Sequence, residues 1–203
     1  MITAPVSPSR NPRATSLDLK LRAVLARRVP RIDEWNTRPR AAVALVLAPH
    51  PDSILLIRRA ERDGDVWSGH LAFPGGRASP SDPDLAFTAV RETMEEVGVT
   101  LDPSARLGQL DDLAPSSPVL PPILVRPFVF AIPQQLTLSP NREVAAAFWL
   151  PLSELTRPDV LRPTEHRRHG TLIRMAGYHL EQGVVWGMTE RILTPFLEVI
   201  SGQ

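Results

Sequence analysis

Three glutamates lie close together in the middle of the chain: Glu92, Glu95 and Glu96. Residues three and four positions apart return to the same side of a helix, so a helix through this segment gathers the three carboxylates on one arc. Carboxylates crowded in this way repel one another, and a hard divalent cation such as Mg²⁺ or Mn²⁺ removes the repulsion because it prefers oxygen ligands. A run of this kind is also typical of a solvated helix face, and the spacing alone leaves both interpretations open.

Two neighbouring features favour a metal site. Arg91 lies one turn before Glu95, where its guanidinium is expected to hold that carboxylate in place. Upstream, the turn Phe73-Pro74-Gly75-Gly76 permits a close backbone approach, which can point a carbonyl at the same ion and leave space for a diphosphate. The combination indicates a cation site beside a phosphate-bearing ligand.

The segment that carries the glutamates predicts one helix with defined ends. Asp82 is expected to be the N-cap, Pro83 occupies the first helical position, where a missing N–H does no harm, and Gly98 ends the helix. Small and apolar residues fall on one face, apart from the arc of glutamates, and this face is expected to pack on the core: Ala86, Ala89, Val90, Thr93 and Val97.

Elsewhere the chain predicts a mixed α/β protein. Apolar runs at 41–48 and 53–58 indicate a hairpin, further strands are expected at 107–113, 123–132 and 144–150, and a hairpin over 172–186 turns near 181–183. Amphipathic patterns over 16–28 and 189–200 predict helices. Since strands outnumber helices and do not alternate strictly with them, we expect a mixed sheet flanked by helices rather than a doubly wound parallel sheet.

The composition excludes several classes of protein. With 203 residues, of which 43% are hydrophobic, the chain is long enough for one globular domain, expected over 15–203 behind a flexible leader at 1–14. The absence of cysteine excludes disulfides, thiolate zinc sites and cysteine nucleophiles. A formal net charge of +1 argues against binding to nucleic acid or to an anionic membrane. The sequence shows no signal peptide and no apolar run of membrane length, so we expect a soluble, cytoplasmic protein.

Proline is unusually frequent. The 22 prolines are roughly twice the usual share, and four of them fall within 114–122. Prolines at this density exclude regular structure, so 114–122 and 157–163 are expected to be irregular segments that border the site.

The residues around the glutamates resemble the Nudix box, Gly-x5-Glu-x7-Arg-Glu-U-x-Glu-Glu-x-Gly-U with U a bulky aliphatic, through Gly76, Arg91-Glu92, Glu95-Glu96 and Gly98-Val99. The resemblance implies a Nudix fold, which is an α/β/α sandwich with a mixed β-sheet. It also implies hydrolysis, dependent on Mg²⁺ or Mn²⁺, of a nucleoside diphosphate linked to another moiety. Three departures are visible: Asp82 replaces the first Glu, eight residues rather than seven separate it from Arg91, and Thr93 replaces an aliphatic residue.

The extra residue resembles the coenzyme A (CoA) pyrophosphatase branch of the family, whose box contains Gly75-Gly76, Asp82, Thr88-Ala89 and Arg91-Glu92 at matching places. The run 55–60 followed by Gly69 and 73–76 is similar to the upstream signature of that branch, with Asp65 where an Arg is expected, and 186–189 is similar to its C-terminal end. The implied substrate is CoA or a CoA thioester. ADP-ribose, NADH and dinucleoside polyphosphates are the alternatives within the enzyme class, and a catalytically silent binding module is a further one. The oligomeric state is left open, with a homodimer among the alternatives.

The resemblance also implies roles for individual residues. Glu92, Glu95 and Glu96 would bind the metal ions, the Gly75 carbonyl would be a further ligand, and Arg91 would orient a carboxylate. Glu143 resembles a Nudix position that contributes another ligand or the general base. Its alternative is a strand-end carboxylate paired with Arg142.

Substrate contacts are expected from residues outside the box. Arg58, Arg59 and Arg62 are suited to phosphates, with surface ion pairs as the alternative. Gly76 leaves space for the diphosphate, and Trp67 in a polar loop is expected to cover a base or the pantetheine arm. The basic run 166–169 is expected to be a solvated loop, with a contact to a 3′-phosphate as its alternative, and Trp149 and Trp186 are expected in the core.

Overall fold

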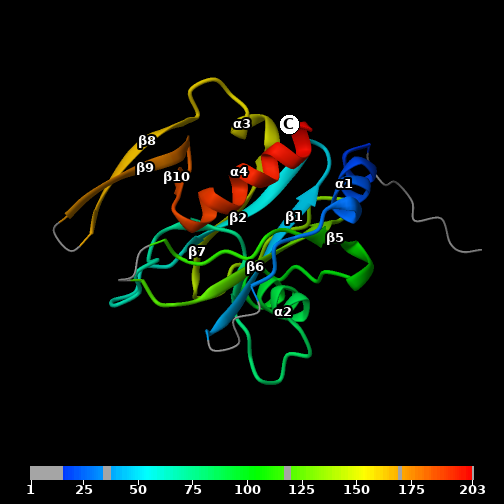
Figure 1. Ribbon diagram of the computed structural model, residues 1–203, viewed down its shortest axis with the longest axis horizontal. Helices are drawn as coiled ribbons and strands as arrows, with labels where there is room; N and C mark the ends of the chain where they lie inside the picture. Colours follow the sequence, from blue (N-terminus) through cyan, green and yellow to red (C-terminus); the bar gives the residue numbers. More distant parts are fainter. Residues whose placement is uncertain (1–15, 34–37, 117–119, 169–170, 203) are drawn as a thin grey trace, which may run out of the picture.

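The computed structural model describes residues 16–33, 38–116, 120–168 and 171–202 (Figure 1). The expected leader at 1–14 and His169 therefore lie outside the described residues. The elements follow in the order α1 (Ser16–Arg27), β1 (Arg40–Ala48), β2 (Ser53–Arg59), β3 (Leu71–Ala72), β4 (Gly75–Arg77), α2 (Leu85–Val97), the 3-10 turn η1 (Pro103–Ala105), β5 (Arg106–Gln109), β6 (Leu124–Ala131), β7 (Val144–Pro151), α3 (Leu152–Leu155), β8 (Leu161–Arg168), β9 (Thr171–Leu180), β10 (Gly183–Trp186) and α4 (Met188–Ser201). In these ranges no helix has the length and apolar character needed to cross a membrane.

The main sheet has seven strands and is mixed. Its strands follow the order β3-β2-β1-β6-β5, with β4 paired to β1 and β7 paired to β2. Strand β1 runs parallel to β6 and antiparallel to β2 and β4. Because β1 is central and covered on both faces, its residues form a nearly continuous buried apolar run. The expected mixed sheet and the first hairpin are confirmed.

Helices cover both faces of this sheet. Alternate residues of β1 point to opposite sides, so Leu45 and Leu47 pack with α1 and α4, whereas Ala44 and Val46 pack with α2. Each side has its own hydrophobic core cluster. Figure 1 shows α4 and α1 on one side of the sheet and α2 on the other, which is the α/β/α sandwich that the sequence predicted.

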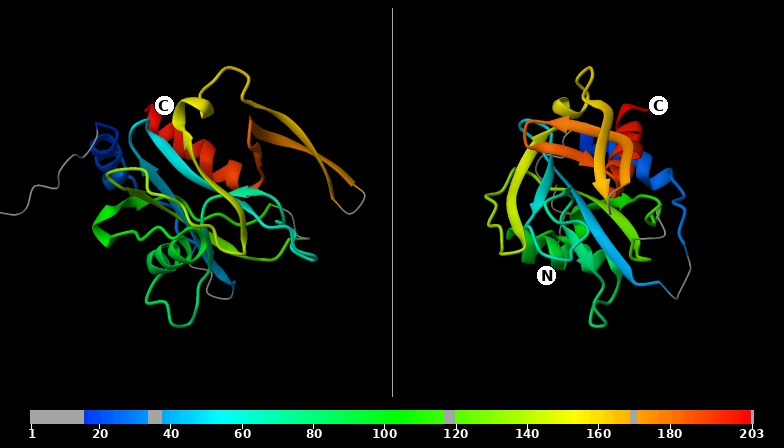
Figure 2. Two further views of the ribbon diagram at one scale, coloured as in Figure 1. Left: turned by 180° about the vertical axis from the view of Figure 1, so that it is seen from behind. Right: turned by 90° about the vertical axis from the view of Figure 1, so that its left-hand side faces the viewer.

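The C-terminal part forms a second sheet that the sequence revealed only partly. Its strand order is β10-β9-β8, and the expected hairpin over 172–186 is confirmed as β9 and β10. Strand β8 was not expected, and the prediction that 157–163 and 166–169 are irregular was wrong for the part from Leu161 to Arg168. Pro163 is accommodated in the strand because β8 lies at the edge of its sheet, where an N–H can be missing. Figure 2 shows β8 and β9 extending away from the main sheet.

Candidate active site

Helix α2 presents the three glutamates. Its buried face contains Ala89, Thr93 and Val97, as the apolar pattern predicted, whereas the predicted Ala86 and Val90 are only half-buried. Thr88 and Glu96 are buried as well, which the pattern did not predict. The N-cap is Asp84, whose Oδ1 accepts the Phe87 N–H at 2.7 Å, so the prediction of Asp82 as N-cap was wrong by two residues. Gly98 ends the helix in the left-handed conformation at φ 73°, as expected.

The three glutamates meet a segment that is distant in sequence. A cavity of about 550 Å³ is lined by Glu92, Glu95 and Glu96 of α2 together with 141–143, which precede β7. Backbone hydrogen bonds fix this segment against the end of α2: Ser139 N–H donates to the Val97 carbonyl and Asn141 N–H to the Glu96 carbonyl, both at 2.9 Å. These bonds satisfy carbonyls that a helix end leaves without partners. They also bring Glu143 to the same cavity as the α2 carboxylates.

Glu96 is the most buried acidic group of the site. It is 3% exposed, and its Oε2 accepts the Gly75 N–H at 2.8 Å. Burial raises the pKa of Glu96 to about 7, and the charges of Glu92 and Glu143 add to the rise, whereas the Gly75 N–H and Arg59 oppose it. Burial also raises the pKa of Glu92, against the influence of Arg91. Burial is thus the main cause of the raised pKa in both groups, and the neighbouring carboxylates add a smaller part.

The two glycines of the Pro-Gly-Gly turn are required by close contacts. Gly75 has φ 151°, and a Cβ built on it would lie 2.2 Å from the Ala42 carbonyl oxygen. A Cβ on Gly76 would lie 2.4 Å from the carboxyl carbon of Glu92. The turn thus passes close to α2, as the sequence predicted, and it contributes the Gly75 N–H to the site.

Arg91 is held by Asp82 in a bidentate ion pair. Arg91 Nε and Nη2 donate to the two carboxylate oxygens of Asp82 at 3.0 Å, and Thr88 Oγ1 donates to the same carboxylate at 2.8 Å. The hydrogen bonds from Arg91 are the main reason that the pKa of Asp82 lies well below its usual range. Fixed in this way, Arg91 Nη1 lies 2.9 Å from Glu92 Oε1 and 3.1 Å from Glu95 Oε2, which confirms its expected contact with Glu95.

The comparison with known proteins agrees with this geometry. The NUDIX domain model matches residues 37–174. The chain belongs to the Nudix hydrolase family. It is 36% identical over 154 residues to the Nudix hydrolase NudL of Photorhabdus laumondii, covering 75% of this chain and 80% of the relative. It is 34% identical to NudL of Yersinia enterocolitica, covering 75% and 77%. In the fold, it is similar to a MutT/nudix family protein from Enterococcus faecalis, with a TM-score of 0.57, 18% identity and coverage of 92% of this chain and 70% of that chain.

Two of the arginines near the Nudix site, Arg59 and Arg62, form ion pairs with carboxylates. Arg59 Nη2 contacts Asp65 at 2.8 Å, and Arg62 Nη2 contacts Glu143 Oε1 at 3.1 Å. The partner of Glu143 is thus Arg62, and the structure gives no ion pair to the alternative partner, Arg142, among the described residues. Arg58 donates to the Gln182 carbonyl in the turn between β9 and β10. In the described ranges Arg59 Nε is buried and lacks an acceptor, and the charge of this guanidinium acts on Glu96.

The tryptophans lie in different surroundings. Trp67 is half-buried against the core on the α1 and α4 side, and its backbone N–H donates to Asp65 Oδ1 at 3.0 Å. Trp149 is half-buried and packs on the other core cluster, with Nε1 donating to the Leu136 carbonyl. Trp186 belongs to neither cluster: its ring stacks on His166, so the prediction that it is a core residue was wrong.

The described residues of 114–122 and 157–163 do not line this cavity, contrary to the expectation. The carbonyl of Ala114 accepts a hydrogen bond from Arg191 of α4, which places the start of 114–122 on the opposite side of the sheet from α2. Within 157–163, Val160 is buried in the core on the α1 and α4 side. The Pro-Gly-Gly turn at 73–76 does reach the carboxylates, through the Gly75 N–H.

The donor set fits a hard divalent cation. Four carboxylates line the cavity, and hard cations prefer oxygen ligands. Among the described residues no three acidic or histidine side chains are already arranged as a metal cage. Each carboxylate instead contacts its own partner: Arg91 for Glu92 and Glu95, the Gly75 N–H for Glu96, and Arg62 for Glu143. Binding of a cation would require these side chains to turn from those partners.

Sequence reasoning missed two features of the site. The bidentate ion pair of Asp82 and Arg91 was not predicted, because Asp82 was assigned to the N-cap of the helix. Asn141 and Arg142 were not predicted to line the cavity, although Asn141 Oδ1 accepts the Glu143 N–H at 2.7 Å and so shapes that turn. An Asx-type turn directly before an apolar strand was the available signal.

Proposed function

We propose that the protein is a metal-dependent diphosphate hydrolase that uses Mg²⁺ or Mn²⁺ to cleave CoA or a CoA thioester. The products would be 4′-phosphopantetheine, or its acylated form, and adenosine 3′,5′-bisphosphate. The observation that carries the proposal is the cavity in which the four carboxylates of Glu92, Glu95, Glu96 and Glu143 converge. Cation-dependent hydrolysis of a diphosphate is the chemistry that such a cavity supports best.

The carboxylates would hold the cation together with the Gly75 carbonyl. When bound, a divalent cation neutralises phosphate oxygens and lowers the pKa of a water molecule. Arg91, fixed by Asp82, orients Glu92 and Glu95. Glu96 is oriented by the Gly75 N–H. These contacts gather the carboxylates around one cavity, and contacts to the cation would replace them when it binds. Charged groups placed around the reacting centre are the main contribution that a protein makes to phosphoryl transfer.

Two further side chains have the chemistry to act on the substrate directly. Glu143 faces the cavity and is the candidate general base, because its carboxylate can accept a proton from the attacking water while Arg62 holds its Oε1. The charge of the Arg59 guanidinium acts on Glu96, so this side chain can pair with a phosphate oxygen near the carboxylates. Arg62 contacts Glu143 and the Gly76 backbone passes next to Glu92, and both complete the proposed diphosphate site.

The preference for CoA is supported by the way the branch-specific residues are joined. Asp82, Thr88 and Arg91 belong to the box of the CoA pyrophosphatase branch, and in the structure they form one hydrogen-bonded unit. The extra residue of that box is accommodated in the turn before α2, where Asp84 takes over the capping of the helix. At position 65 the chain departs from the branch signature, which has an Arg there. Asp65 forms an ion pair with Arg59, so this position offers no positive charge to a substrate.

A substrate screen tests this proposal. Purified protein is incubated with Mg²⁺ or Mn²⁺ and with CoA, ADP-ribose, NADH and diadenosine polyphosphates, and products are identified by mass spectrometry. We expect cleavage of CoA, loss of cleavage in Glu96→Gln and normal cleavage in Glu181→Gln, which removes an exposed carboxylate from the turn before β10. Absence of any diphosphate cleavage, or full activity in Glu96→Gln, would contradict the enzyme proposal. Turnover of ADP-ribose, NADH or a dinucleoside polyphosphate without CoA would contradict the substrate alone.

A further inference from the structure

Among the described residues, no helix covers one face of the second sheet (Figure 2). Cross-strand register places a set of side chains on this side of β8, β9 and β10, and we call this set the arm face: Arg162, His166, Ile173, Met175, His179 and Trp186. The opposite side of the sheet packs on the core at its base, where Tyr178 and Val185 are buried. The residues of the arm face are only partly buried or exposed, whereas Thr164, on the same side of β8, is buried.

A column of rings lies at the base of the arm face. The Trp186 indole stacks on the His166 imidazole with ring centroids 3.6 Å apart and an interplanar angle of 12°. On the same indole, His70 packs at 4.4 Å with a tilt of 54°. Gly177, the register partner of Trp186, leaves space for the neighbouring side chains, because a Cβ on it would lie 2.8 Å from Val184 Cγ1 and 2.9 Å from Thr164 Cγ2. Planar rings of this kind are the groups on which nucleic-acid bases stack.

A short stretch of chain links the column to the candidate active site. His70 directly precedes β3 and lies five positions before Gly75, whose N–H donates to Glu96. Five residues span at most about 18 Å even when fully extended, so His70 lies within that distance of the Gly75 N–H. Arg58 of β2 donates to the Gln182 carbonyl and attaches the second sheet to the main one. An extended substrate such as CoA has to bridge this span to contact both the carboxylates and the rings.

The arm face is also suited to an anion. It carries the exposed guanidinium of Arg162 and the imidazoles of His166 and His179, and none of its described residues is acidic. His179 Nε2 is buried and has no hydrogen-bond partner in the part of the chain that the structure describes. Glu165 and Arg174 are register partners on the opposite side of the sheet. Positive charge, unsatisfied imidazole nitrogen and stacked rings together match a purine nucleotide with an additional phosphate.

We propose that the arm face binds the 3′-phosphoadenosine end of the substrate, with the base against the ring column and the 3′-phosphate near Arg162. The inference rests on the proposed function, because it assigns one end of the CoA molecule to this surface. It identifies Arg162 and Trp186 as specificity-determining residues outside the Nudix box. Selection of CoA over its analogue without the 3′-phosphate would then be made by the second sheet.

Binding of the product analogue tests the inference without any turnover. Calorimetry compares the affinity of the protein for adenosine 3′,5′-bisphosphate and for AMP, which lacks the 3′-phosphate. We expect the bisphosphate to bind at least about tenfold more tightly, as is typical for a charge-assisted contact. Arg162→Gln should remove that preference, and Trp186→Leu should weaken both nucleotides by about tenfold. Arg174→Gln is the matched control, since it removes an arginine from the opposite side of the same hairpin, and it should keep the preference.

Kinetics with two substrates separate this inference from the proposed function. In Arg162→Gln we expect KM for CoA to rise about tenfold with kcat unchanged, and both constants for dephospho-CoA to stay as in the wild type. Cleavage of CoA and dephospho-CoA with equal KM by the wild-type protein would overturn the inference and leave the proposed function standing. If no diphosphate is cleaved but the bisphosphate preference disappears specifically in Arg162→Gln, the arm face is supported and the proposed function fails.

Two other results would overturn the inference. One is an identical bisphosphate preference in Arg162→Gln and Arg174→Gln. The other is a dimer, measured by analytical ultracentrifugation, that dissociates in Trp186→Leu while the nucleotide affinities stay unchanged. That outcome would assign the arm face to a second copy of the chain.

Discussion

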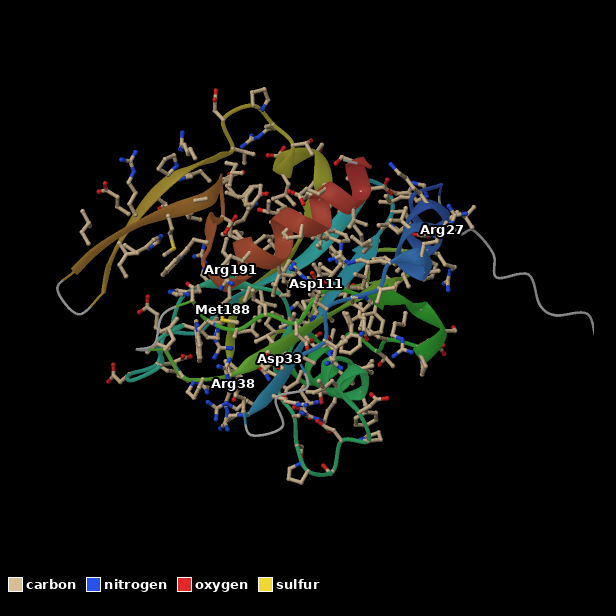
Figure 3. All side chains as sticks on the ribbon, viewed as in Figure 1. Arg27, Asp33, Arg38, Asp111, Met188 and Arg191 are labelled. Carbon is tan, nitrogen blue, oxygen red and sulfur yellow. The ribbon has the colours of Figure 1, made fainter. Side chains whose placement is uncertain are left out.

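Two charged cavities lie on opposite faces of the main sheet, and they shift the pKa values of their carboxylates in opposite directions. The acidic cavity beside α2 raises the pKa of Glu92 and of Glu96. The second cavity, about 370 Å³ in volume, lies between the segment after α1, the residues after β5, and α4. There burial opposes the ionised form of Asp111, but hydrogen bonds from Arg28 and Arg31 outweigh it and lower the pKa of this group. Figure 3 shows Asp111 and Arg191 on this side of the molecule.

The difference comes from pairing rather than from the number of charges. Asp111 contacts Arg28 at 2.7 Å and Arg31 at 2.8 Å, and Asp112 accepts two bonds of 2.7 Å from Arg126. These pairs join the segment after α1 and strand β6 to the residues after β5. In the acidic cavity, four carboxylates lie together, and the pKa values of Glu92 and Glu96 are raised despite the nearby arginines. A cavity with a charged lining is therefore a candidate ligand site when its carboxylates have raised pKa values, and not when each is paired with an arginine.

The largest expected difference between the cavities is in catalysis. Glu96→Gln should lower kcat/KM for the cleaved diphosphate by about a thousandfold or more, which corresponds to about 4 kcal/mol of transition-state stabilisation. Asp111→Asn removes a carboxylate from the second cavity and should leave kcat/KM per folded molecule close to that of the wild type. Steady-state kinetics on both variants, with the folded fraction measured by circular dichroism, checks the contrast. A similar loss in both variants would contradict it.

For the free energy of unfolding we expect the reverse: substitutions in the second cavity should matter more than substitutions in the acidic cavity. The Asp112 side chain is 1% exposed and paired with Arg126, so Asp112→Ala leaves a half-buried guanidinium without its partner. We expect the free energy of unfolding to fall by about 3 kcal/mol, because removal of one member of a buried pair is strongly destabilising. Glu95→Gln, on the exposed side of the acidic cavity, should change it little. Urea unfolding measures both, and a stable Asp112→Ala protein would show that this pair is not structural.

Metal ions should act on one cavity alone. Addition of Mg²⁺ or Mn²⁺ should stabilise the wild-type protein by about 2.7 kcal/mol at a concentration one hundred times Kd, because the cation binds the folded state selectively. The resulting rise in Tm should be lost in Glu92→Gln and kept in Asp111→Asn. Thermal denaturation with and without EDTA makes the comparison. A metal-dependent rise in Glu92→Gln equal to that of the wild type would remove Glu92 from the metal site.

The smallest expected effect is the response of stability to acid. Because the folded state lowers the pKa of Asp111, the stabilisation from this group is complete above the pKa of the unfolded chain, near 3.8, and is lost as pH falls through the folded value. The free energy of unfolding of the wild type should therefore fall more steeply between pH 5 and 3 than that of Asp111→Asn. Urea unfolding across this range gives both slopes, and parallel slopes would show that Asp111 is not stabilised by its arginines.

Much of the fold was predictable because it depends on short-range patterns. Short apolar runs located β1, β2, β6 and β7, and amphipathic periodicity located α1, α2 and α4. Strand β8 was not predicted because its sequence has no apolar alternation of its own. It contains Pro163 and three consecutive basic or histidine residues from His166. It is a strand because β9 pairs with it along its whole length.

In the candidate site, too, local sequence patterns predicted some features and tertiary contacts set the others. By itself the sequence determined that Glu92, Glu95 and Glu96 share one side of a helix that ends at Gly98, because helical spacing and a glycine terminus are encoded within a few residues. Only the tertiary structure decided that Glu143 joins them, that Asp82 binds Arg91 rather than the helix end, and that Trp186 stacks on His166. These contacts join residues from different elements or compete with a nearby alternative. Their outcome depends on strand register and burial, which no local pattern specifies.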